Sequence, residues 1–73
     1  MMVEVFKTNV TNPDHADRLI DQIHHAWREY KANFDLEDCD RILRVKSATG
    51  RIQASLLINL LKDEGFRAEV LPD

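Results

Sequence analysis

The side chains of this chain that are capable of chemistry lie in three short stretches, and the first is Asp14-His15. A carboxylate and an imidazole are ligands that Zn(II), Cu(II) and Ni(II) accept. Zinc usually takes three or four protein ligands, so this pair alone makes a weak site at most. The other interpretation, which we favour, is that both side chains are polar groups in the first turn of a well-capped helix.

The second stretch surrounds Cys39, the only cysteine, which lies between Asp38 and Asp40. A thiol is a candidate metal ligand or redox group, but neighbouring carboxylates disfavour the reactive thiolate. The acidic residues also lack the spacing of a calcium-binding EF-hand loop. We therefore expect the solvated tip of a hairpin. The sequence leaves open whether this tip lies near His15.

The third stretch is His24-His25. Adjacent residues of a helix point about 100° apart, so these two rings do not converge on one ion as a pair four residues apart would. We expect a solvated helix face here.

The sequence shows no Ser/His/Asp set or paired-carboxylate site, and with two glycines it offers no phosphate-binding loop. These features predict a protein that is not an enzyme and has no cofactor.

Length and charge narrow the remaining classes of function. Seventy-three residues predict one domain, residues 1–73. A net charge of −3 gives no general attraction to nucleic acid or anionic membranes. The basic segment Arg41–Lys46 carries no aromatic residue for base stacking, so we expect no nucleic-acid binding. Without an apolar run of membrane length, a signal-like start or a second cysteine, the chain is expected in the cytoplasm, with no membrane insertion.

The element that must position Asp14 and His15 is a helix predicted over Pro13–Trp27. Asn12 is a good N-cap residue, and Pro13 suits the first helical position. The apolar residues recur every three or four positions and so form one face, made of Ala16, Leu19, Ile20, Ile23 and Trp27.

Four strands are predicted around the helices. The first covers residues 2–8, where adjacent Val5 and Phe6 leave open which side faces the core. From Tyr30 to Leu36 apolar and polar residues alternate, which indicates a strand with one buried face. A polar break at Glu37–Asp40 has hairpin length, and the other two strands are expected at Arg41–Lys46 and Arg67–Leu71.

A second helix is predicted over Ile52–Glu64 and ends before Gly65. Its core face is expected to consist of Ala54, Leu57, Ile58 and Leu61. Leu56 and Leu60 widen the apolar arc to roughly 200°. One interpretation is a deeply embedded helix. The other is an exposed Leu56/Leu60 stripe at a contact with a second copy or with another protein.

The order of predicted elements is strand, helix, strand, strand, helix, strand. Each helix then connects two parallel strands, and such crossovers are right-handed in nearly all cases. This order predicts an α+β, ferredoxin-like βαββαβ fold. Both helices should cover one face of a four-stranded antiparallel sheet.

Over essentially its whole length the sequence resembles the heavy-metal-associated domain family of copper chaperones and metal-transport modules. The stretch Phe6–His15 looks like the family's strand and metal loop. Phe34-Asp35-Leu36-Glu37 looks like the second strand's apolar-acidic-apolar signature, and residues 64–70 look like the end of the second helix with the final strand.

The resemblance also implies a departure from the family's chemistry. Asn12 and His15 stand where the family's Cys-x-x-Cys pair would lie, so both thiolates that bind soft metals are replaced. We therefore expect a non-enzymatic protein-interaction module that associates with another protein or with itself. The alternative is a metal carrier or chaperone with a weaker Zn, Cu or Ni site at His15 and Asp14, shared between chains.

Overall fold

The computed structural model describes residues 2–72 and contains the six elements in the expected βαββαβ order. The strands are β1 (Met2–Thr8), β2 (Tyr30–Asp35), β3 (Ile42–Ser47) and β4 (Ala68–Val70). The helices are α1 (Pro13–Ala26) and α2 (Ala54–Asp63). Neither helix is both long and apolar enough to cross a membrane.

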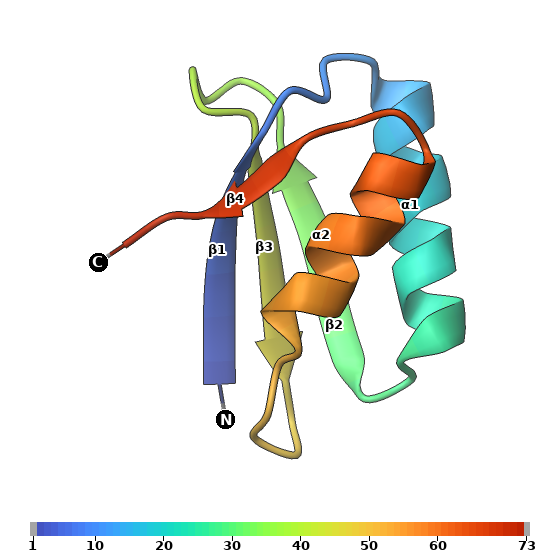
Figure 1. Cartoon of the computed structure of the whole chain (residues 1–73), viewed down its shortest axis with the longest axis vertical. Coiled ribbons are helices and arrows are strands. Elements are labelled where there is room, and N and C mark those ends of the chain that lie inside the picture. The colour runs from blue at the N-terminus through green and yellow to red at the C-terminus, as the bar shows by residue number, and fades with distance from the viewer. Residues whose placement is uncertain (1, 73) are drawn as a thin grey trace.

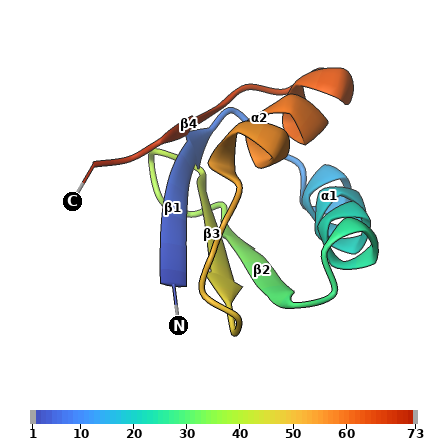
Figure 2. The same ribbon diagram turned by 60° about the horizontal axis from the view of Figure 1, so that its bottom comes forward.

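The strands form one sheet in the order β2-β3-β1-β4, and every neighbouring pair is antiparallel. Phe6 is paired with Leu43 on one side and with Val70 on the other, so β1 lies inside the sheet. Both helices cover the same face of this sheet (Figures 1 and 2). The predicted ferredoxin-like α+β arrangement is therefore confirmed.

The face of β1 that the sequence left open is settled by burial. Phe6 is fully buried and belongs to the core, whereas Val3 is 47% exposed. Val3, Val5 and Lys7 alternate with Phe6 and consequently lie on the sheet face without helices. In β3, Leu43 and Val45 are in the core. Ile42, next to Leu43 in the strand, is buried but lies outside the core cluster.

Helix α1 packs through the predicted apolar face, with Ala16, Leu19 and Ile23 buried. It ends one residue earlier than expected, at Ala26. Trp27 is the C-cap residue in an extended conformation, and its backbone N–H donates to the Ile23 carbonyl. The Trp27 indole then stacks on the Tyr30 ring, with centroids 5.4 Å apart. This contact joins the end of α1 to the start of β2.

Helix α2 begins at Ala54 rather than Ile52. Its N-cap residue, Gln53, forms no side-chain capping bond, and instead the Gln53 N–H donates to the Tyr30 hydroxyl at 2.9 Å. Leu57 and Leu61 are fully buried. After the helix, Gly65 adopts a φ of +92°, a conformation that favours glycine. The following N–H, from Phe66, donates to the Leu61 carbonyl at 2.9 Å, which closes the helix end.

Candidate functional site

Thr8, the last residue of β1, fixes the start of the loop between β1 and α1 through two hydrogen bonds of its hydroxyl. Its buried hydroxyl donates to the Arg41 carbonyl at 2.6 Å and accepts from the Val10 N–H at 3.2 Å. Val10 is itself fully buried. The loop is therefore fixed to the core at one end and to the start of β3 at the same time.

Asn12 closes the other end of the loop. Its backbone is extended, and its side-chain oxygen accepts from the Asp14 N–H at 2.8 Å. Its carbonyl accepts from the Ala16 N–H at 3.0 Å, which starts the helical ladder behind Pro13. The Asp14 carboxyl lies in the first turn, where negative charge stabilises the helix dipole. The N-cap predicted from the sequence is confirmed.

His15 is half-buried and packs against the ring of Phe66, with centroids 5.4 Å apart and planes inclined by 53°. Asp14 beside it is exposed. Within residues 2–72, neither belongs to a group of three or more ligand atoms close enough to hold an ion. His15 is thus placed as a packing residue that connects the first turn of α1 to the segment after α2.

One group of ligand atoms does come together, at the β2–β3 hairpin. Single ligand atoms of Asp38, Cys39 and Asp40 lie within 4.8 Å of one another. The Asp38 carboxylate already accepts from the Asp40 N–H at 2.8 Å, and the Asp40 carboxylate faces the Lys7 ammonium at 3.9 Å. These contacts are those of a tight polar turn with exposed acidic groups.

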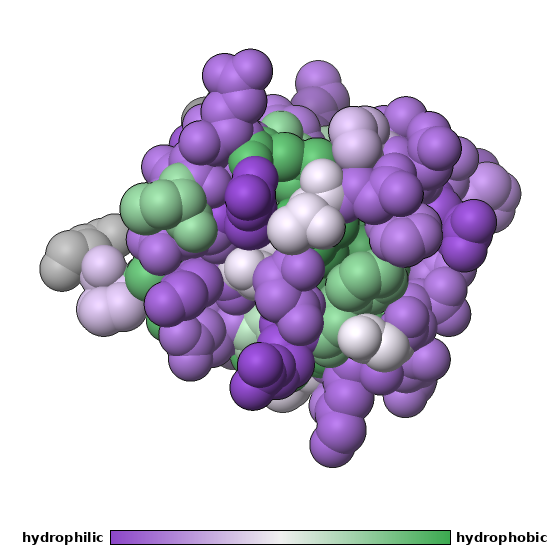
Figure 3. Space-filling view, turned by 90° about the horizontal axis from the view of Figure 1, so that it is seen from above, coloured by the Kyte–Doolittle hydropathy of each residue, from purple (hydrophilic) through white to green (hydrophobic). Residues whose placement is uncertain are grey.

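The hairpin lies at the same end of the molecule as the first loop, a question that the sequence left open. The Thr8 N–H donates to the Asp40 carbonyl at 3.0 Å, so the hairpin touches the last residue of β1. Figure 3 shows this end of the molecule. Its apolar residues form a narrow, interrupted strip surrounded by hydrophilic side chains.

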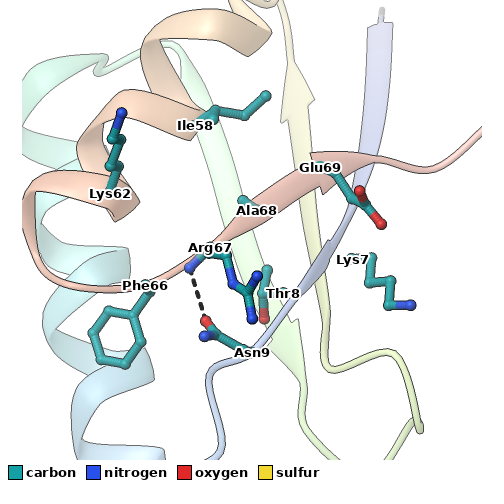
Figure 4. A pocket seen from close by; sticks show the side chains of 9 residues that line it. All are labelled: Lys7, Thr8, Asn9, Ile58, Lys62, Phe66, Arg67, Ala68 and Glu69. Carbon is teal, nitrogen blue, oxygen red and sulfur yellow. Dashed lines mark hydrogen bonds between the residues drawn. The ribbon is translucent and has the colours of Figure 1, made fainter.

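A pocket of about 510 Å³ opens beside β4 and is lined by Lys7, Thr8, Asn9, Ile58, Lys62, Phe66, Arg67, Ala68 and Glu69 (Figure 4). Asn9 holds the two segments together, since its side-chain oxygen accepts from the Arg67 N–H at 2.8 Å. The side chains of Lys7, Lys62 and Arg67 point in different directions in Figure 4. They consequently do not converge on one anion. No sequence pattern indicates this pocket, because its lining comes from three elements that only the fold brings together.

A shallower groove of about 390 Å³ lies between the two helices. Its apolar lining is Leu56, Leu60 and Trp27, and its polar lining is Gln22, Asn59, Asp63 and Glu64. Leu56 is 43% exposed, whereas Leu60 is half-buried and packs against the core. The wide apolar arc of α2 is thus partly used by the core and partly left at the surface.

The two adjacent histidines of α1 serve different partners. The Nε2 atom of His24 accepts from the Ala32 N–H of β2 at 3.0 Å. The Nδ1 atom of His25 lies 3.1 Å from the Asp21 carbonyl, one turn earlier on its own helix. The two rings therefore contact different backbone groups. Both histidines lie on the exposed helix face that the sequence predicted, but nothing in the sequence indicated the contact of His24 with the sheet.

Comparison with protein-family models, with curated proteins and with solved structures gives no match to this chain. The basis for a functional proposal is therefore the geometry of the loop, the hairpin and the helix groove.

Proposed function

We propose that this chain is a non-enzymatic protein-interaction module of the heavy-metal-associated type in which the soft-metal site has been replaced. The main support is the loop at Asn12. In the family that the sequence resembles, two cysteines at this loop bind the metal. Here the Asn12 side chain caps α1 and His15 packs on Phe66, so the loop keeps its position through bonds within the chain.

The surface that best fits a protein partner is the groove between the helices. Leu56 is one of the few large apolar side chains that stay exposed, and it adjoins Leu60 and Trp27. The polar side of the groove carries the carboxylates of Asp63 and Glu64. Apolar surface beside negative charge suits a segment of another protein that presents apolar side chains next to Lys or Arg.

A selection experiment tests this assignment. The purified protein is panned against a random peptide library displayed on phage, and recovered peptides are measured by calorimetry. We expect apolar sequences flanked by basic residues. Leu56→Glu should abolish their binding, while Ser55→Glu, which adds the same charge at the exposed neighbouring position, should leave it unchanged. If no peptide is enriched, or if Leu56→Glu has no effect, the groove is not the contact surface.

The second candidate is a metal carrier with a weak site at His15 and Asp14. The observation in its favour is that Asp38, Cys39 and Asp40 bring three more ligand atoms together at the same end of the molecule. Elemental analysis and metal titration of reduced protein without a histidine tag separate the two functions. Stoichiometric Zn(II) or Cu(I) binding that His15→Ala abolishes would establish the carrier and overturn the interaction module.

The proposal also places the protein in the reducing cytoplasm, on the ground that its single cysteine, Cys39, has no partner for a disulfide within the chain.

A further inference from the structure

Strand β2 is an outer strand of the sheet (Figure 1). Its outward backbone groups are partly occupied. Residues Lys31, Asn33 and Asp35 alternate with Tyr30, Ala32 and Phe34, and in an antiparallel ladder every second residue directs both backbone groups away from the neighbour. The Tyr30 N–H donates to the Trp27 carbonyl at 3.1 Å. The Ala32 N–H donates to the His24 ring at 3.0 Å. Tyr30, Ala32 and Phe34 are therefore the outward set.

We propose that β2 is a self-pairing edge through which two copies of this chain form a continuous sheet, and that the His24 ring blocks this pairing because it occupies the Ala32 N–H. The helix groove is a separate surface, since no residue of β2 lines it. The partner is a second copy of the chain, because the charges of β2 are self-complementary.

The self-complementarity follows from the spacing along the strand. An antiparallel pair centred on Asn33 sets Lys31 of each copy opposite the partner's Asp35. Neither Lys31 nor Asp35 forms an ion pair with any other of residues 2–72. In the same register, Ala32 lies opposite the partner's Phe34, and both are outward residues able to exchange N–H···O=C bonds. Opposite charges directly across antiparallel strands stabilise a pair, and like charges destabilise it.

The opposite face of the strand supports the same register. Ala32 and Phe34 are half-buried beneath the helices, and Phe34 would gain further burial against Ala32 of the second copy. The twofold arrangement is isologous and closed, so it predicts a dimer and no longer assembly. At the other edge, β4 has three residues, and its outer side therefore offers less backbone for pairing.

His24 acts as the block because of the atom that it uses. A nitrogen that accepts from a backbone N–H carries a lone pair and no proton, so this bond exists only in the neutral ring with its proton on Nδ1. A side chain without an acceptor at this position leaves the Ala32 N–H free to pair with a second strand.

The ionisable residues within four positions of His24 along the chain are Asp21, His25 and Arg28, and those of β2 are Tyr30, Lys31 and Asp35. Tyr30 uses its hydroxyl on Gln53 and Arg51. Lys31 and Asp35 project from the sheet face without helices, opposite to the face on which α1 lies. The bond to the Ala32 N–H is thus the contact through which the His24 ring holds the edge of β2.

Sedimentation equilibrium tests the block with three variants. His24→Ala removes the acceptor, His24→Gln keeps a side-chain acceptor, and His25→Ala is the matched control on the neighbouring position. We expect His24→Ala to dimerise roughly tenfold more tightly than wild type and His25→Ala, the gain expected from freeing a hydrogen-bonding group on each chain. His24→Gln should associate as weakly as the wild type.

Charge reversal tests the register. On the His24→Ala background at neutral pH, Lys31→Asp alone and Asp35→Lys alone should each be monomeric, because like charges then face each other across the twofold axis. An equal mixture of the two should form a heterodimer, because every facing pair is again opposite in charge. A monomeric His24→Ala protein, a mixture that associates no better than its components, or species larger than a dimer would each overturn the proposal. A charge effect without any effect of Leu56→Glu separates this surface from the helix groove.

Discussion

Replacing Asn12 by alanine is the sharpest test of how the first loop is held. The change removes the acceptor of the 2.8 Å bond from the Asp14 N–H and leaves the helix ladder intact. Because this N–H is exposed, water solvates it once it is freed, and no penalty for a buried unsatisfied group is added. The expected loss is therefore the usual N-cap value, about 1 kcal/mol of unfolding free energy. For a domain of this size that corresponds to a decrease in Tm of about 4–8 °C.

Urea denaturation followed by circular dichroism measures the change, with Thr11→Ala at the exposed preceding position as control. Asn12→Asp should keep the stability of the wild type, because a carboxylate also accepts from the Asp14 N–H and suits the helix N-terminus. If Asn12→Ala is as stable as Thr11→Ala, the capping bond does not hold the loop. A wild-type stability that falls on addition of a chelator would show that a metal does.

Three further predictions follow from the same structure. Thr8→Val should cost about 1–3 kcal/mol in urea denaturation, because it leaves the Val10 N–H without its buried acceptor; an unchanged midpoint would contradict it. Leu61→Ala should lower the unfolding free energy by about 2–5 kcal/mol in the same assay, whereas Leu56→Ala should change it by less than about 0.5 kcal/mol, because Leu61 is fully buried and Leu56 is 43% exposed. Changing Asn12 and His15 together to cysteine should confer tight Cu(I) binding in an anaerobic chelator competition that wild type and Asn12→Cys fail, and failure of the double variant would argue against the family resemblance.

Local chemistry predicted much of the fold. The N-cap at Asn12, the apolar face of α1 and the glycine after α2 depend on neighbouring residues, so they were visible in the sequence and are confirmed. The start of α2 was placed two residues early because Gln53 offers no side-chain cap. The turn is set instead by the hydroxyl of Tyr30, more than twenty residues earlier in the chain, and no local pattern reports such a contact.

In the candidate sites, too, features set by neighbouring residues were predictable and contacts between distant segments were not. The spacing of His24 and His25 predicted an exposed helix face, which is confirmed, but it did not indicate that His24 contacts a backbone N–H of β2. Its contact with Ala32 depends on how closely α1 approaches β2, which is a property of the packed layers. Likewise, the positions of His15 against Phe66 and of the hairpin beside Thr8 result from the closing of the sheet.

The inner position of β1 has a consequence for how the chain folds. Strand β1 is synthesised before both of its neighbours, since β3 and β4 begin only at Ile42 and Ala68. Phe6 therefore has no strand partner until a loop of more than thirty residues has closed, and the entropy of that closure precedes any gain from pairing. Domains dominated by such distant pairings fold more slowly than helical bundles of similar size. During synthesis β1 stays unpaired until β3 has emerged, and a chaperone that binds extended apolar segments would find its target in β1 during that interval.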